Sequence, residues 1–190
     1  MKRLRRVLVA GLVGLAACSS ATRTASPQDE FFAGLRALCG ARFEGAMTFP
    51  EEGRDDFSGK LLVAEFSGCA EHEMRIPFAV GDDHSRTWVF SNRSGGLRLQ
   101  HDHRHADGTP DAVTLYGGMA TPDGSALSQS FAADAYTAAL IPDAATNLWT
   151  ITLDAAGDEL TYHLERHQQP RFTARLRRVA NESGKARAAL

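Results

Sequence analysis

From Gly40 onward, apolar and polar residues alternate with a period of two, and clusters of turn-forming residues interrupt this alternation about every ten to fourteen residues. Such alternation is typical of half-buried antiparallel strands, and no segment between the turn clusters has a helical period. We therefore expect a succession of β-strands, each antiparallel to the strand before it. The expected strands cover residues 42–49, 60–66, 73–80, 86–92, 97–105, 112–119, 127–131, 135–141, 148–154, 159–166 and 171–179.

A single short helix is predicted ahead of these strands, over residues 27–38. Ser26 and Pro27 have the properties of a helix cap and a first helical residue. Apolar residues then recur at helical spacing, at Phe31, Phe32, Leu35 and Leu38. Eight to ten strands in a meander can close on themselves and leave no exposed edge. The sequence therefore predicts a mainly β fold, an antiparallel up-and-down barrel of about eight to ten strands preceded by one helix, with a two-sheet sandwich as the alternative. This order of elements resembles the calycin (lipocalin-type) barrels.

The first eighteen residues have the pattern of an export signal. Basic residues precede an apolar run over residues 7–17, which is too short to cross a hydrocarbon core of about 30 Å. The run ends in Leu15-Ala16-Ala17-Cys18, which resembles the lipobox of bacterial lipoproteins. The resemblance implies that residues 1–17 are removed and that Cys18 carries the lipid. An ordinary signal peptide with a chance cysteine is the alternative.

The same resemblance implies a location in the cell envelope. Ser19, and not aspartate, follows the cysteine, which favours an outer-membrane lipoprotein on the periplasmic side. Acyl chains contribute about 0.8 kcal/mol per buried CH₂, so the membrane is an expected partner through a durable anchor. We expect a tether over residues 18–26, one domain over residues 27–179 and a loose tail over residues 180–190.

Composition excludes one class of partner and predicts one crosslink. Loss of the leader changes the formal net charge from −2 to −6, which argues against nucleic acid as a partner. The two remaining cysteines are Cys39 and Cys69. An exported protein lies in an oxidising compartment, so we expect a disulfide between them. A reactive thiol or a metal ligand is the alternative, although the sequence has no CxxC motif.

The most distinctive string is HDHRH, at residues 101–105. Residues two apart on a strand share a face. One face of the predicted strand carries Leu97, Leu99, His101, His103 and His105. We therefore expect the three imidazoles to point into the barrel near one end, with His103 at least partly buried.

Neighbouring segments supply further candidates. Residues 97–105 and 112–119 are predicted to form a hairpin, which places Thr114 or Tyr116 opposite the histidines. Arg86 stands at a strand start, where it would reach an anionic ligand or pair with Asp102. Arg86 and Tyr116 therefore join the three histidines as candidate ligand-binding residues.

Asp102 and Arg104 share the outer face, where we expect an ion pair. Leu160, Tyr162 and Leu164 share one face of their strand, and Trp88 and Trp149 are interpreted as core or cavity-wall aromatics.

A metal site is the alternative interpretation of the histidines. Imidazoles two residues apart, at about 7 Å, can converge on one ion. Such a site would use His101 with His103, or His103 with His105, plus a ligand from another strand. More distant candidates are His72, Asp83 and His84. A divalent metal such as zinc is the cofactor that this alternative implies. We expect no other cofactor, because the sequence has no P-loop and no GxGxxG motif.

Three strings carry a resemblance to a family. SRTW (85–88), GLRLQHDHRH-x-DG (96–108) and LYGG (115–118) are similar to strings in a group of uncharacterised bacterial exported proteins and lipoproteins. The resemblance covers roughly residues 30–179. It implies that residues 84–118 are the region of interest, and it implies no activity.

The sequence identifies no enzymatic activity, and several hypotheses stay open. The first is a module that binds a small ligand or an envelope partner at a histidine-lined barrel end. The second is a metal carrier or a metal-dependent enzyme, and the third is a purely structural envelope lipoprotein with no pocket. For the histidines themselves, hydrogen bonding to acids and water at the barrel end is a further alternative. We adopt the first, because a closed barrel usually offers one cavity and its polar groups mark the site.

Overall fold

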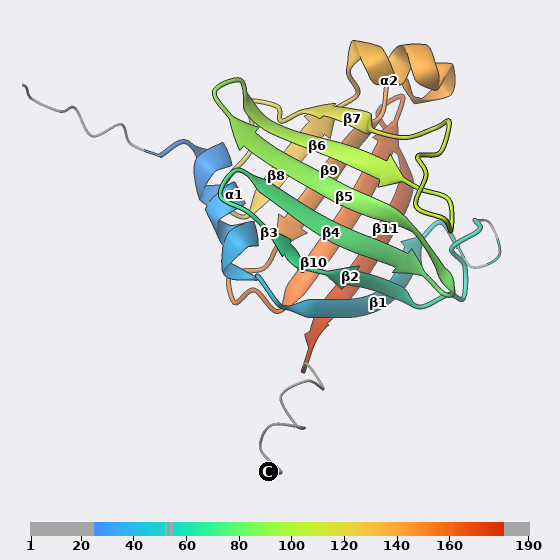
Figure 1. The fold of residues 1–190 in the computed structure, drawn as a ribbon, viewed down its shortest axis with the longest axis horizontal. Coiled ribbons are helices and arrows are strands. Elements are labelled where there is room, and N and C mark those ends of the chain that lie inside the picture. Colours follow the sequence, from blue (N-terminus) through green and yellow to red (C-terminus); the bar gives the residue numbers. More distant parts are fainter. Residues whose placement is uncertain (1–24, 52, 54, 181–190) are drawn as a thin grey trace, which may run out of the picture.

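The computed structural model describes residues 25–51, 53 and 55–180, and in it a nearly closed antiparallel barrel follows one short helix (Figure 1). The elements in chain order are α1 (Pro27–Ala37), β1 (Arg42–Phe49), β2 (Leu62–Glu65), β3 (Gly68–Cys69), β4 (Glu73–Val80), β5 (Asp83–Arg93), β6 (Gly96–His103), β7 (Tyr116–Met119), β8 (Ser128–Ala132), α2 (Ala135–Leu140), the 3₁₀ turn η1 (Pro142–Ala144), β9 (Leu148–Leu153), β10 (Glu159–Arg166) and β11 (Gln169–Val179). The expected lipidation residue Cys18, with its signal peptide, lies outside the described residues.

One sheet contains every strand. Hydrogen-bonded neighbours follow the order β7-β6-β5-β4-β2-β1-β11-β10-β9-β8, and the short β3 pairs with β4 beside this path. Ten strands in one continuous order confirm the predicted antiparallel barrel, and they exclude the sandwich of two separate sheets. The chain-distant pair β1 and β11 lies in the middle of this order, where β1 pairs along almost its full length.

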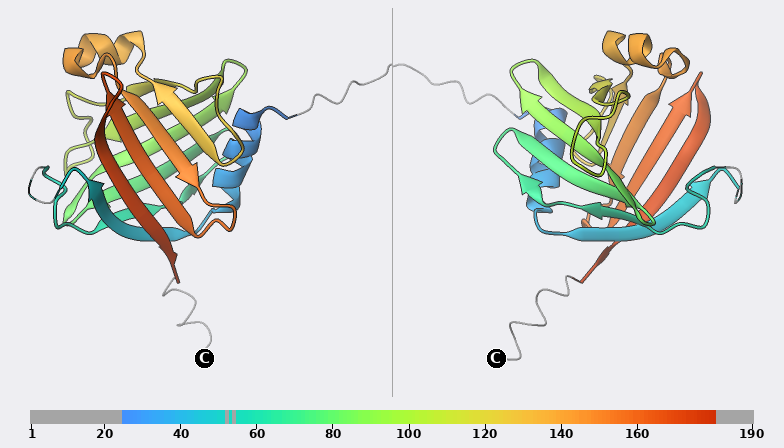
Figure 2. Two further views of the ribbon diagram at one scale, coloured as in Figure 1. Left: turned by 180° about the vertical axis from the view of Figure 1, so that it is seen from behind. Right: turned by 45° about the vertical axis from the view of Figure 1, so that its right-hand side comes forward.

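The helix α1 closes one end of the barrel (Figures 1 and 2). It begins as predicted: the Ser26 hydroxyl accepts from the Asp29 backbone N–H, and the Asp29 carboxylate accepts from the Ser26 N–H, both at 3.1 Å. Phe31 and Leu35 are fully buried against the ends of the strands. We call this the closed end, and we call the opposite end, beside the β1–β2 and β6–β7 connections, the open end.

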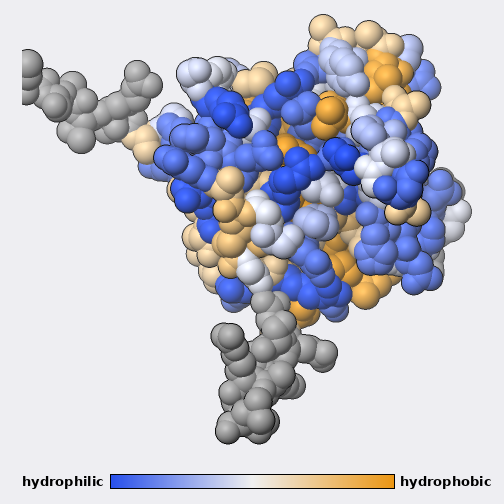
Figure 3. All heavy atoms as spheres, in the orientation of Figure 1, coloured by the Kyte–Doolittle hydropathy of each residue, from blue (hydrophilic) through white to orange (hydrophobic). Residues whose placement is uncertain are grey.

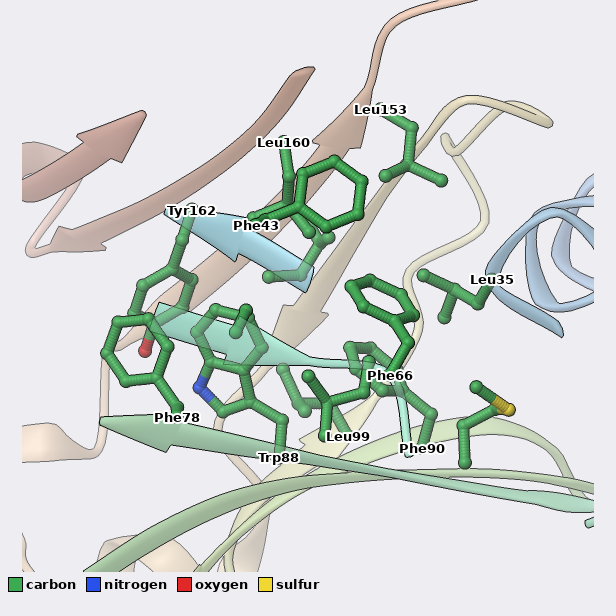
Figure 4. Close-up of a cluster of buried hydrophobic side chains, with 14 of the residues drawn as sticks. Leu35, Phe43, Phe66, Phe78, Trp88, Phe90, Leu99, Leu153, Leu160 and Tyr162 are labelled. Atoms are coloured by element: carbon green, nitrogen blue, oxygen red, sulfur yellow. The ribbon is translucent and has the colours of Figure 1, made fainter. Parts of the chain in front are cut away.

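Aromatic side chains fill the barrel between the two ends (Figure 4). Phe78 stacks on Trp88 with ring centroids 4.4 Å apart, and Tyr162 packs against Trp88 at 4.8 Å. Nearer the closed end, Phe31 of α1 contacts Phe90. Polar side chains cover most of the face shown in Figure 3. This division between a buried and a solvated face produces the period of two in the sequence.

A disulfide fastens the helix to the barrel wall. Cys39, just after α1, is bonded to Cys69 of β3, as predicted. The bridge spans a sequence separation of 30 residues, for which the loop-entropy model gives about 3–4 kcal/mol of stabilisation.

Residues 135–141 do not form the expected strand. They form α2, because the Asp134 side chain accepts a hydrogen bond from the Thr137 N–H at 2.8 Å and caps a helix there. Arg98 of β6 holds the same carboxylate at 2.7 Å. The local cap and its arginine partner therefore outweigh the alternating pattern. The expected strand over residues 112–119 is also shorter, and only Tyr116–Met119 pairs as β7.

The barrel closes where β7 meets β8, through a few contacts. Ala120 and Phe131 form an isolated bridge, and the Thr121 N–H donates to the Ser130 carbonyl at 2.7 Å. Gly118 allows this approach, because a Cβ built on it would lie 1.7 Å from the Ala132 carbonyl oxygen. Closure of the barrel between β7 and β8 therefore requires a glycine at position 118.

We predict that Gly118→Ala lowers the free energy of unfolding by about 2–3 kcal/mol, because the added methyl group forces β7 away from residue 132. Urea titration followed by circular dichroism measures this change. Gly95→Ala is the control, since nothing lies within 4 Å of its Cβ, and it should change stability by less than about 0.5 kcal/mol. Equal effects of the two substitutions would contradict the close approach at the seam.

Candidate functional site

The structure confirms the predicted face of β6 for two of the three histidines. Leu97 and Leu99 are buried in the core, and His101 follows them inward with 5 % of its surface exposed. His103 is half-buried, also as predicted. His105 does not belong to this face, because β6 ends at His103 and the His105 N–H turns to bond the Thr109 carbonyl. Its side chain is exposed, so the alternation of the strand no longer determines its direction.

His101 connects two opposite parts of the barrel wall. Its Nδ1 lies 3.3 Å from the Tyr116 backbone oxygen in β7, and its Nε2 lies 3.0 Å from the Tyr162 hydroxyl in β10. A carbonyl oxygen only accepts, so Nδ1 carries the proton and Nε2 accepts from Tyr162. The His101 and Tyr116 rings also stack, with centroids 4.8 Å apart and planes 12° apart. The expected position of Tyr116 opposite the histidines is therefore confirmed, at His101.

Burial keeps this group of side chains neutral. It lowers the pKa of His101 to about 3, because a charged imidazole would lose its hydration. Burial likewise raises the pKa of Tyr116 to about 12 and that of Tyr162 well above its usual value. At neutral pH the three side chains are an uncharged imidazole and two protonated phenols. They can pack against a ligand and form hydrogen bonds with it, but they carry no charge to pair with one.

His103 and Arg86 lie nearer the open end. The His103 Nε2 is 3.0 Å from the Tyr116 hydroxyl, and burial together with the nearby Arg86 charge lowers the His103 pKa. Arg86 pairs with Asp83 at 2.5 Å, and its guanidinium lies 5.2 Å from the centre of the Phe57 ring. Asp83 therefore takes the place that we expected for Asp102.

Asp102 lies on the outer face yet is buried. Arg75 and Arg104 both bind its carboxylate, at 2.5 and 3.1 Å, and the Thr114 hydroxyl donates to it at 3.3 Å. The predicted pair with Arg104 is confirmed. The carboxylate is nevertheless 2 % exposed, because Thr114 of the β6–β7 connection and Arg75 pack against it. This cluster fastens the connection to the wall.

A cavity of about 270 Å³ opens at the open end. Five aromatic side chains contribute to its wall: Phe57, Tyr116, Trp149, Tyr162 and Phe172. Ile141, Ala144 and Leu164 add apolar surface, and Asn147 lies among them. The charged lining residues are Asp55, Asp56, Arg166 and Arg171. At about 30 Å³ per water molecule, this volume corresponds to about nine waters, which suits a small organic molecule.

The cavity includes only part of the predicted site. Among the described residues, Tyr116 is the one predicted ligand-binding residue that lines the cavity. His101 supports Tyr116 and Tyr162 from behind, and Arg86 contacts the lining residue Phe57. The interpretation of Trp149 as a wall residue and of Trp88 as a core residue is confirmed.

Sequence reasoning missed Arg166, although a signal was present. Tyr162, Leu164 and Arg166 follow one another at alternate positions of β10, and all three line the cavity. Continuing the face of the first two by one step would have found the third. The remaining missed residues come from the β1–β2 connection, from the segment around η1 and from β11. β11 follows β10 directly in a hairpin, whereas the β1–β2 connection is distant from β10 in the sequence.

The metal alternative receives no support from the hydrogen bonds. In the described part of the chain, no group of three or more histidine, cysteine, aspartate or glutamate side chains is placed to hold a metal ion. Both ring nitrogens of His101 already have partners, so coordination there would break two hydrogen bonds. His72 and His84 are exposed, away from the cavity lining.

Comparisons with known proteins add no identification. No family model, no curated protein and no solved structure matches this chain. The resemblances to exported lipoproteins and to calycin barrels therefore stay predictions. Over the residues that the structure describes, no helix has the length and apolar character needed to cross a membrane.

The buried imidazole predicts a specific pH dependence of stability. The pKa of His101 is about 3 in the folded state, against an ordinary value of 6.5, so the unfolded chain binds this proton first as the pH falls. The stabilisation is complete above about pH 6.5 and is lost as the pH falls toward 3, by up to about 1.4 kcal/mol per pH unit. His101→Leu should remove this contribution from the slope between pH 6 and 4, as measured by urea unfolding.

His105→Gln is the matched control, because this ring is exposed and should leave the slope unchanged. A His101→Leu slope equal to that of the unmodified protein would show that the ring is not buried in its neutral form.

Proposed function

We propose that this protein is a lipid-anchored envelope lipoprotein that binds a small, largely apolar ligand in the cavity at the open end of its barrel. The observation that supports this proposal is the cavity of about 270 Å³ with its five aromatic wall residues. Apolar concave sites with a few placed polar groups are the usual form of small-ligand sites. The lipid anchor rests on the sequence pattern that ends at Cys18.

The arrangement of the two ends supports binding at the open end. The closed end is filled by α1, whose Phe31 and Leu35 are fully buried. The open end has the cavity instead, between residues 55–57, η1 and the ends of β9 to β11. A ligand seated there would exchange water for aromatic surface, at about 25 cal/mol per Å² of apolar area buried.

The polar groups behind the wall support a binding function more than catalysis. His101 donates to a backbone carbonyl and accepts from Tyr162, and its low pKa keeps it uncharged at neutral pH. A general base works best with a pKa near the operating pH. His101 therefore acts as a positioning residue for the rings of Tyr116 and Tyr162, which form part of the wall.

The test is calorimetric titration with 2-naphthol, a neutral two-ring probe. We expect saturable 1:1 binding with a Kd below about 1 mM, in line with the efficiency of small apolar ligands. Leu164→Trp should weaken binding at least tenfold, because Leu164 lines the cavity and the larger ring fills it. Ile141→Trp, at the rim, is a second filling variant in case the first disturbs folding.

Thr161→Trp is the control on the same strand, since Thr161 alternates with the inward-facing Leu160 and Tyr162. It should bind the probe as the unmodified protein does. Absence of saturable binding, or equal affinities of the Leu164→Trp and Thr161→Trp proteins, would overturn the proposal.

A further inference from the structure

The aromatic wall of the cavity is continuous around one side. Phe57 meets Phe172 edge-on with ring centroids 5.1 Å apart, and Phe172 lies 5.7 Å from Tyr162. Tyr116 and Trp149 form a second contact, at 6.1 Å. Aromatic rings pack well by offset or edge contacts with other rings. A flat, unsaturated ligand therefore fits this wall better than a flexible chain of the same size.

The charges that line the cavity are not equivalent. Arg171 pairs with Asp55 at 3.4 Å, so each has an opposite charge beside it. Arg166 is half-buried, and its Nε donates to the Asn147 side-chain oxygen at 2.9 Å. Within the described residues, no carboxylate lies within 4.0 Å of the Arg166 guanidinium. Asp56 also lacks an ion pair there, but it is exposed to solvent.

Arg166 is therefore fixed in position by Asn147, and its positive charge has no carboxylate partner among the described residues. The bond from Nε to Asn147 fixes the guanidinium and leaves both Nη groups with their hydrogens. A pair of parallel N–H groups matches a carboxylate, and such charge-assisted pairs are about twice as strong as neutral ones. Asn147 is itself 5 % exposed, so the support is buried.

The strand places this cation at the outer end of the wall. Tyr162, Leu164 and Arg166 are successive inward positions of β10, which span about 13 Å between the first and last Cα atoms. Tyr162 bonds the buried His101, so it marks the inner end. A ligand with a ring against Tyr162 and Leu164 would direct a substituent toward Arg166.

We propose, building on the function proposed above, that the ligand of this cavity is a planar aromatic carboxylate whose ring packs on the wall and whose acid group binds Arg166.

Arg86 also lies near the wall, but its charge is paired with that of Asp83 at 2.5 Å. Arg86 lowers the pKa of both Tyr116 and Tyr162, in opposition to burial. Aromatic cages also bind quaternary ammonium ions, but the Arg166 guanidinium, which has no carboxylate partner among the described residues, repels a cation and attracts an anion.

The test compares three probes with the same ring system: 2-naphthoate, neutral 2-naphthol and the cation 2-(aminomethyl)naphthalene. Calorimetric titration at neutral pH should give a Kd for 2-naphthoate at least ten times lower than that for 2-naphthol. The cation should bind no more tightly than 2-naphthol. Arg166→Gln should raise the Kd for 2-naphthoate to the value for 2-naphthol and leave 2-naphthol binding unchanged.

Arg175→Gln is the matched control, because it removes the same charge from an exposed position of the neighbouring β11. It should leave all three affinities unchanged. Equal affinities for 2-naphthoate and 2-naphthol, or tightest binding of the cation, would overturn this inference and leave the proposed function standing. Binding of none of the probes would overturn the proposed function itself.

Discussion

The two hydrogen bonds of His101 are the interaction on which the open end depends. They join β6, the backbone of β7 and the side chain of Tyr162 in β10, which lie on different sides of the barrel. A neutral imidazole with one donor and one acceptor satisfies both neighbours without a charge. The same ring stacks on Tyr116 and packs 5.1 Å from Trp149, so three wall residues take their positions from one side chain. The hydrogen-bonded pair of His101 and Tyr162 inside the barrel therefore supports the aromatic surface of the cavity.

Much of the fold could be predicted from the sequence because alternation reports burial directly. The bounds of β1, β4 and β10 agree with the predicted ranges, and the Ser26 cap was recognisable from its neighbours. Alternation also predicted the inward direction of His101. It failed at His105 and at residues 135–141, where a turn and a capped helix replace the strand, because both depend on a few local hydrogen bonds.

The candidate site was harder to predict than the fold. Tyr116 and Trp149 were accessible to reasoning about faces, but Phe57 belongs to a connection with no periodic pattern. Phe172 and Arg171 lie on β11, which pairs with β10 in a hairpin, and Phe57 and Asp55 contact them from the β1–β2 connection. That contact depends on the pairing of β11 with the distant β1, which has no signature in a single sequence. The most conspicuous string in the sequence, HDHRH, lies behind the cavity wall and beside it, and none of its residues lines the cavity.

The bond between Cys39 and Cys69 has a consequence for access to the interior of the barrel. It ties the end of α1 to β3, so the helix cannot swing away from the closed end while the bridge is intact. A ligand bound as proposed would therefore enter and leave through the open end. The residence time of such a ligand would then depend on the rim around Phe57, whose ring contacts Arg86 and Phe172.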